Sequence, residues 1–301
     1  VACGTAYHAG LVGKKVIEKF AKIPVEVDVA SEFRYREPLV DEKTLFIAIS
    51  QSGETLDTLA ALREAKSKGA RILSVVNVVG SSVARESDDV FYTWAGPEIA
   101  VASTKAYTAQ VAVLAILAAQ LNNSIDINLN YELSKVSNAM EAICDERDKL
   151  ALLAEDYLKD QRSCFYIGRG MDYFVCLEAS LKLKEISYIQ TEGFAAGELK
   201  HGTIALIENN TPVIAVISQE NINLNTRSNI KEVKSRGAHV LTISTKAQSA
   251  QKDQIILNDV HELLSPLVTV VPAQYLAYYA ALQKGCDIDK PRNLAKSVTV
   301  E

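Results

Sequence analysis

The segment Ser50-Gln51-Ser52-Gly53-Glu54-Thr55 combines three hydroxyl side chains with a glycine. It follows an apolar run typical of a buried strand and precedes a helical pattern. A helix N-terminus carries unpaired N–H groups and a partial positive charge, so such a turn suits an anion. The Gly-Lys-Ser/Thr signature of a nucleotide triphosphate loop is missing. The turn therefore favours a small phosphate, and an ordinary polar turn with a serine cap is the alternative.

A second group of reactive side chains lies on one stripe of a predicted helix. Glu178, Lys182 and Glu185 are spaced at i, i+4 and i+7. A solvated, salt-bridged face is the commoner outcome of such spacing. Apolar neighbours leave little of this helix free for solvent, however, and a carboxylate beside a lysine in a half-buried setting is how a general base is tuned.

Three other places gather groups that can act in chemistry. His201 lies in a glycine-flanked loop, where acid/base use competes with a plain surface role. Ser103 and Thr104 are predicted to cap the long helix that follows them. The tail 292–301 is expected to be disordered by default. Its apolar residues suggest instead that it packs down and carries Lys296 into a site.

Composition excludes several classes of protein. The 301 residues are 48% hydrophobic and 23% charged, as in a globular protein with a large core. The net charge of −5 argues against nucleic-acid binding. Five scattered cysteines without a CxxC pair indicate reduced thiols in a cytoplasmic protein, and the histidines lack metal-ligand spacing. The longest apolar helix candidate is too short to span a membrane. The chain begins inside what looks like a motif, so we expect a fragment of a longer protein.

Strands alternate with helices along the chain. Strands are predicted at 25–29, 45–49, 71–79 and 90–94, and helices at 7–21, 56–68, 105–121, 131–159 and 177–190. Short connections between such elements predict a parallel α/β sheet with helices on both faces.

The second half of the chain repeats the first. Residues 47–75 align without a gap on 215–243, with Ser50 opposite Ser218 and Gly69 opposite Gly237. Two copies of one α/β unit are the better interpretation. In the second copy the turn reads Glu220-Asn221-Ile222-Asn223, which loses hydroxyls and glycine and adds an acid. We expect only the first turn to hold phosphate.

Longer motifs then identify a family. These are CGT at 3–5, SQSGET at 50–55, GPEIAVASTKAYT at 96–108, LKLKEISYI at 181–189, GELKHG at 197–202 and KPRNLAKSVTVE at 290–301. Over its whole length the chain resembles the isomerase half of the glucosamine-6-phosphate synthases. The resemblance implies two tandem SIS (sugar isomerase) domains, each a three-layer α/β/α sandwich. The expected boundaries are 1–125, a helical linker 126–154, 155–289 and a C-terminal tail 290–301.

The resemblance also implies roles for individual residues. The sugar phosphate or sugar is expected to contact Thr5, Ser50, Gln51, Ser52, Thr55, Val101, Ser103 and Ala295. Four others are expected to act in catalysis: Glu185 as the base between C1 and C2, Lys182 as its electrophilic neighbour, His201 in ring opening, and Lys296 in a Schiff base with the ketose. No metal or cofactor is implied.

The implied reaction converts fructose 6-phosphate and ammonia to glucosamine 6-phosphate, the first step of hexosamine biosynthesis. Its implied partners are an N-terminal glutaminase domain, absent here, and a second subunit that receives His201 in a homodimer. Two departures stand out: Ala6 replaces a usual serine and Ala100 a usual glycine. The lost hydroxyl should weaken phosphate binding by about 1 kcal/mol. The alternatives are a deglycase or isomerase for another sugar phosphate, and a non-catalytic SIS sensor without the catalytic set.

Overall fold

The computed structural model of the chain describes residues 1–121 and 127–299. The chain forms two compact units, one of 1–125 with 293–301 and the other of 126–292. The predicted boundary between 125 and 126 lies outside the described residues, and the four-part division of the chain remains a prediction. None of the described helices is long and apolar enough to cross a membrane.

The first unit is built on a three-stranded parallel sheet of order β1-β2-β3. Its elements are α1 (Gly4–Phe20), α2 (Ala30–Phe33), β1 (Leu45–Ser50), α3 (Leu56–Ser67), β2 (Arg71–Val76), α4 (Ser82–Glu86), β3 (Asp89–Tyr92) and α5 (Lys105–Gln120). An isolated bridge between Ala2 and Val29 joins the chain start to the segment before α2. The predicted parallel α/β architecture is confirmed.

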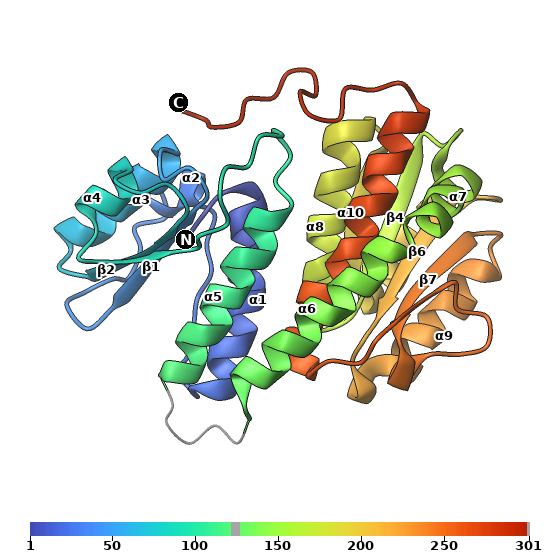
Figure 1. Cartoon of the computed structure of the whole chain (residues 1–301), viewed down its shortest axis with the longest axis horizontal. Coiled ribbons are helices and arrows are strands. Elements are labelled where there is room, and N and C mark those ends of the chain that lie inside the picture. Colours follow the sequence, from blue (N-terminus) through green and yellow to red (C-terminus); the bar gives the residue numbers. More distant parts are fainter. Residues whose placement is uncertain (122–126, 300–301) are drawn as a thin grey trace. The chain divides into compact units, whose positions relative to one another are not determined.

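Helices cover both faces of this sheet. On one face α2, α3 and α4 bury a cluster that includes Phe33, Phe46 and Leu62. On the other face Ile49 and Val75 pack against Leu114 of α5, and α1 lies alongside α5 (Figure 1). The apolar strand residues are therefore buried on both sides, which explains their continuous rather than alternating pattern.

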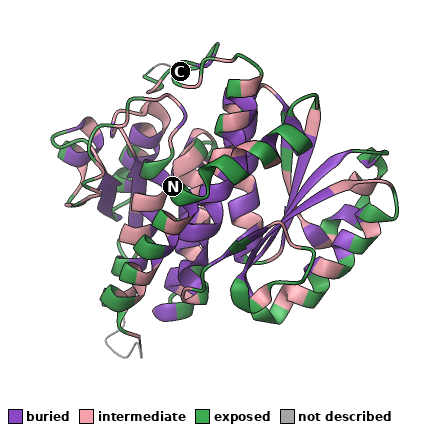
Figure 2. Cartoon of the chain, turned by 45° about the vertical axis from the view of Figure 1, so that its right-hand side comes forward, coloured by how far each residue is buried: buried purple, intermediate pink, exposed green. Residues whose placement is uncertain are grey.

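The second unit contains a five-stranded parallel sheet of order β5-β4-β6-β7-β8. Its elements are α6 (Leu129–Asp145), α7 (Arg147–Leu158), β4 (Ser163–Gly168), α8 (Met171–Ser187), β5 (Gln190–Ala195), the 3₁₀ helices η1 (Ala196–His201), η2 (Thr203–Leu206) and η3 (Glu220–Ile222), β6 (Pro212–Ile217), α9 (Asn223–Lys234), β7 (His239–Thr245), η4 (Lys246–Gln248), β8 (Ile255–Leu257), η5 (Glu262–Leu264) and α10 (Ser265–Gln283). Figure 2 shows that its central strands are buried.

The two faces of this sheet are covered by different helices. Ile230 and Val233 of α9, with Leu199 of η1, pack on one face. On the other, α8 packs on β4 and against α10, its neighbour over much of its length (Figure 1). The face of α8 that turns towards α10 and the sheet is therefore withdrawn from water.

Most predicted elements are confirmed within a few residues, and three predictions are wrong. Residues 25–28 form no strand, because only Val29 pairs with a neighbouring segment. The single helix expected at 131–159 is two helices that meet at Glu146. The helix expected at 177–190 begins earlier, at Met171, and ends where Tyr188 adopts a left-handed conformation.

The repeat is confirmed as two copies of a β-α-β unit. Gly69 and Gly237, which the alignment pairs, have φ angles of +90° and +94°. Each follows the central helix of its unit, where a left-handed residue ends the helix. The chain after each glycine enters the next parallel strand of its own sheet.

The gapless alignment of the copies is wrong by one residue in the strands. In the first unit Ile49 lies opposite Val75. In the second unit Val216 lies opposite Ile243. The alignment pairs Ile49 with Ile217 and would therefore place Ile217 opposite Ile243. The two serines that the alignment matched also differ in position, because Ser50 is the last residue of β1 whereas Ser218 follows β6.

Candidate active site

The predicted phosphate turn is a tight loop at the end of β1. The hydroxyl oxygen of Ser50 accepts a hydrogen bond from the backbone N–H of Gly53 at 3.0 Å and lies 3.3 Å from the Thr55 hydroxyl. Gly53 has a φ of +64°, and a Cβ there would lie 2.0 Å from Oγ of Ser81. Both the backbone conformation and the close approach therefore require glycine.

Neighbouring segments hold this loop in place. The backbone N–H groups of Asn77 and Val83 donate to the carbonyls of Gln51 and Gly53 at 3.2 and 2.9 Å. The Glu54 carboxylate accepts from the N–H of Ser82 at 2.8 Å. Hydrogen bonds from Ser82 lower the pKa of Glu54, so this carboxylate is a structural anchor of the loop.

The tail packs on the same loop, against the default expectation of disorder. The Ser297 hydroxyl donates to the Ser52 hydroxyl at 3.1 Å. The backbone N–H of Leu56, at the start of α3, donates to the carbonyl of Val298 at 3.1 Å. Ser297 thus contacts the predicted phosphate turn, a contact that the sequence interpretation missed. Ala295, two residues before Ser297 in the tail, is exposed.

Lys296 is directed by the tail into the loop that precedes α5. Its Nζ donates to the carbonyl of Ala100 at 2.7 Å and to the Ser103 hydroxyl at 3.4 Å. Half-buried Val101 belongs to the same loop. Within the first unit, the structure thus joins the tail to both predicted substrate loops. Thr5 lies in the first turn of α1.

The prediction that serine and threonine hydroxyls cap α5 is wrong. Thr104 occupies the N-cap position without a side-chain cap hydrogen bond. The Glu98 carboxylate takes this role, because its Oε1 accepts from the N–H of Thr104 at 2.6 Å. A helix N-terminus stabilises a carboxylate in this position. Sequence alone could not distinguish this acid from an exposed loop residue.

In the second unit, Glu178, Lys182 and Glu185 form a buried charge cluster on α8. Lys182 Nζ lies 2.6 Å from Glu185 Oε2 and 3.6 Å from Glu178 Oε1. The side chains of Lys182, Glu178 and Glu185 are 2%, 0% and 20% exposed. The solvated-face interpretation is therefore wrong, and the half-buried one is correct.

The electrostatics of this cluster suit proton transfer. Burial opposes the charged form of Lys182, but the two carboxylates prevail and raise its pKa. The lysine therefore stays an ammonium that can polarise an oxygen. Glu185 retains the exposure needed to reach a carbon-bound proton, whereas Glu178 is fully enclosed. The spacing in the sequence places Glu178 on the same stripe as Lys182. Only the fold shows that Glu178 is a buried counter-charge to Lys182.

His201 is the last residue of η1 and is exposed. The neighbouring Lys200 forms an ion pair with Glu232 at 2.9 Å. This ion pair ties the histidine-bearing segment to α9 and leaves the imidazole at the surface of the second unit.

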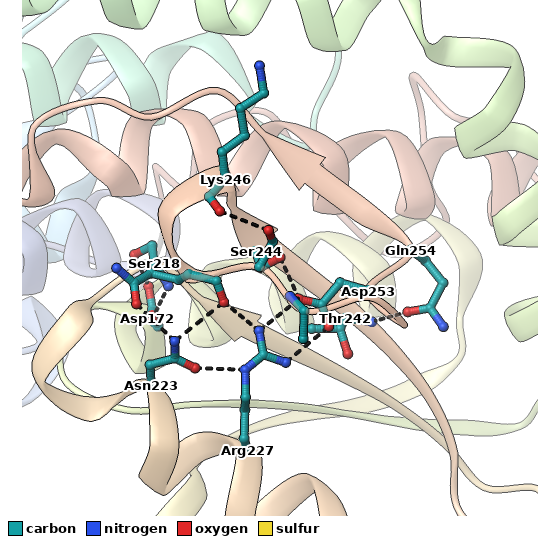
Figure 3. A network of polar contacts seen from close by, with 12 residues as sticks. Asp172, Ser218, Asn223, Arg227, Thr242, Ser244, Lys246, Asp253 and Gln254 are labelled. Atoms are coloured by element: carbon teal, nitrogen blue, oxygen red, sulfur yellow. Dashed lines mark hydrogen bonds and ion pairs between the residues drawn. The ribbon is translucent and has the colours of Figure 1, made fainter.

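In the second copy a carboxylate of the protein itself binds the residue that directly follows β6. Gly4 and Gly170 share a φ of +54° at the starts of α1 and α8, so Asp172, two residues after Gly170, takes the place of Ala6. Its carboxylate accepts from the backbone N–H of Ser218 at 2.9 Å and from the Ser218 hydroxyl (Figure 3). This arrangement supports the expectation that the second turn holds no phosphate.

Figure 3 also shows a second polar network beside Asp172. Arg227 of α9 pairs with Asp253 at 2.8 Å, and Asp253 accepts from the Ser244 hydroxyl of β7 at 2.8 Å. The network joins α9, β7 and the turn before β8.

Asp172 should make stability depend on pH. Burial raises its pKa from 3.8 to about 6, against the opposing hydrogen bonds of Ser218. A pKa raised by folding favours the folded state at low pH, and this contribution is lost as the pH rises through 6. We expect the free energy of unfolding of wild type relative to Asp172→Asn to fall by about 2–3 kcal/mol between pH 4 and pH 7. Urea unfolding across this range measures it. The exposed Asp89→Asn is the control, and a flat or rising difference for Asp172→Asn contradicts the prediction.

Comparison with known proteins agrees with this geometry. The family model of the SIS domain matches residues 1–120 and 157–284. The chain therefore belongs to the SIS-domain family, and it consists of two such domains in tandem.

Within this family the similarity points to one kind of enzyme. The chain is 60% identical over 305 residues to glutamine–fructose-6-phosphate aminotransferase (isomerizing) of Bacillus licheniformis, and 58% identical to that of Bacillus subtilis. Each alignment covers 100% of this chain and 51% of the relative, so the chain spans about half the length of these curated relatives. The family resemblance found in the sequence is confirmed.

Two solved structures of differently named enzymes have a similar fold. The C-terminal domain of glucosamine-fructose-6-phosphate aminotransferase from Francisella tularensis matches with a TM-score of 0.91 and 40% identity, covering 96% of this chain and 85% of that one. Glucosamine-6-phosphate deaminase from Thermotoga maritima matches with a TM-score of 0.84 and 25% identity, covering 99% and 88%.

Proposed function

We propose that this chain is the isomerase part of a glutamine–fructose-6-phosphate aminotransferase. The full-length protein would convert fructose 6-phosphate and ammonia to glucosamine 6-phosphate. The observation that carries the proposal is the Lys182–Glu185 pair, a buried ammonium 2.6 Å from a partly exposed carboxylate. Such a pair suits proton transfer beside an oxygen that gains negative charge.

The proposed roles follow from chemistry. The hydroxyls and backbone N–H groups of loop 50–55 would hold the phosphate, and His201 would open the sugar ring. Lys296 would form a Schiff base at C2 of the ketose. The C2 oxygen would leave as water in that step, and ammonia would then replace the Lys296 nitrogen at C2 by transimination, which frees the lysine. Glu185 would remove a proton from C1 and return it to C2, giving the 2-amino aldose phosphate.

The partners are part of the same proposal. Ammonia would come from glutamine through a glutaminase domain of the full-length protein, as the names of the relatives suggest. We also propose that the enzyme is a cytoplasmic homodimer in which His201 serves the site of the neighbouring subunit. A non-catalytic sensor is disfavoured, because such a protein is expected to keep the phosphate loop but to lack the catalytic set, and this chain has all four members, Lys182, Glu185, His201 and Lys296.

Hydrogen exchange into the substrate tests the proposal. We expect the chain, incubated with fructose 6-phosphate in heavy water without ammonia, to introduce deuterium at C1 and C2 as it interconverts the ketose and aldose phosphates. NMR of the sugar measures the exchange. Substrate that stays free of deuterium would contradict the proposed function.

A further inference from the structure

The two carboxylate oxygens of Glu98 have different neighbours: Oε1 caps α5, and Oε2 lies beside the ammonium of Lys296. Its side chain is 4% exposed. Oε1 accepts from the N–H groups of Thr104 and Ala106 at 2.6 and 3.5 Å, at the start of α5. These bonds orient the carboxylate and hold the loop before α5 in one conformation.

The second oxygen of Glu98 faces Lys296. Among the residues that the structure describes, Oε2 is buried without a hydrogen-bond partner, and it lies 3.5 Å from Lys296 Nζ. A buried carboxylate oxygen is costly unless a charge or donor compensates it. The same Nζ donates to Ala100 and Ser103. One loop therefore surrounds the ammonium with a carboxylate, a carbonyl and a hydroxyl.

We propose that Glu98 is the positioning residue for Lys296, and that it couples the conformation of the tail to the loop before α5. This inference rests on the proposed function, in which Lys296 reacts with the open-chain ketose. For that step the ammonium gives up one proton, for which Oε2 is the adjacent acceptor. Nζ then forms a bond to C2, the C2 oxygen takes up protons and leaves as water, and a protonated imine remains.

The test uses Glu98→Gln in the full chain, because glutamine retains an Oε1 that can cap α5 and removes only the charge. The probe is fructose 6-phosphate with sodium borohydride, which reduces the imine to a stable adduct on Lys296 that mass spectrometry detects. We expect trapping to slow by about 10- to 100-fold. The dissociation constant of fructose 6-phosphate, measured by calorimetry, should change less than about threefold, because loop 50–55 is intact.

Glu86→Gln is the matched control. Glu86 lies in the same unit and forms an exposed ion pair with Arg63 at 2.6 Å. This variant should be trapped at the wild-type rate. Wild-type trapping in Glu98→Gln overturns the inference and leaves the proposed function standing. An equal loss of binding and trapping also overturns it, because a helix cap alone would cause that. A wild type that gives no adduct on Lys296 counts against the proposed function instead.

A second variant tests the coupling without touching the α5 cap, should Glu98→Gln fail to fold. The N–H of Leu56 donates to the carbonyl of Val298 in the docked tail. If the Glu98–Lys296 pair holds the tail, Lys296→Met should speed hydrogen exchange at the Leu56 amide by about tenfold or more. Unchanged protection of Leu56 overturns the inference.

Discussion

Glu185→Gln is expected to slow deuterium incorporation into fructose 6-phosphate by about 10²- to 10⁴-fold, the usual contribution of a positioned general base. Glutamine has the shape of glutamate but cannot accept the C1 proton. Its oxygen can still accept from Lys182, whose Nζ lies 2.6 Å from Glu185 Oε2. NMR of the sugar in heavy water gives the rate, and calorimetry should give nearly unchanged substrate binding.

The matched control is Glu155→Gln in the same unit. Glu155 pairs with Lys159 at 2.7 Å on the exposed side of α7, so this variant should exchange at the wild-type rate. Full exchange by Glu185→Gln would remove Glu185 from the mechanism. Mixing Glu185→Gln with His201→Ala subunits should restore part of the activity if a site takes its histidine from a neighbour. A mixture as inactive as its components would indicate self-sufficient subunits.

Lys182→Met is expected to lower the free energy of unfolding by about 3–5 kcal/mol, the cost of leaving a buried charge without its partner. Methionine fills a similar volume, so little of the loss comes from a cavity. The cost arises at Glu178, which is fully buried 3.6 Å from the lysine. Urea unfolding at pH 7 measures the effect. Adding Glu178→Gln to Lys182→Met should recover part of the loss, because it removes the buried negative charge that Lys182 balances.

An exposed pair supplies the comparison for this measurement. Lys159 pairs with Glu155 at i,i+4 in α7, with both side chains about half exposed. Lys159→Met should change stability by less than about 0.5 kcal/mol. A loss below about 1 kcal/mol for Lys182→Met would mean that water reaches Glu178 and that the cluster is not a buried one.

Some features of this protein follow from local sequence. The apolar run at 45–49 and the glycine at position 69 predicted β1 and the end of α3, because backbone preference and hydrophobic period act within a few residues. The hydroxyls and the glycine at 50–55 likewise led to the prediction of a phosphate turn. The motifs at 50–55, 181–189 and 290–301 identified the family for the same reason, since each is a contiguous run of residues.

Other features were decided by tertiary structure alone. The spacing of Glu178, Lys182 and Glu185 is the same on an exposed face as on a buried one, and the packing of α10 and the sheet against α8 makes the difference. Glu98 became a helix cap and a partner of Lys296 because the loop before α5 folds over it and the tail returns to meet it.

The register between neighbouring strands is also decided by tertiary structure alone. A one-residue shift leaves every local preference satisfied, and only the partner strand shows which residue lies opposite which. The sequence by itself therefore determined most of the elements and the family, and it predicted the phosphate turn. The burial of the charge cluster, the docking of the tail and the binding of the Asp172 carboxylate to Ser218 depend on contacts between distant residues, and only the tertiary structure decided them.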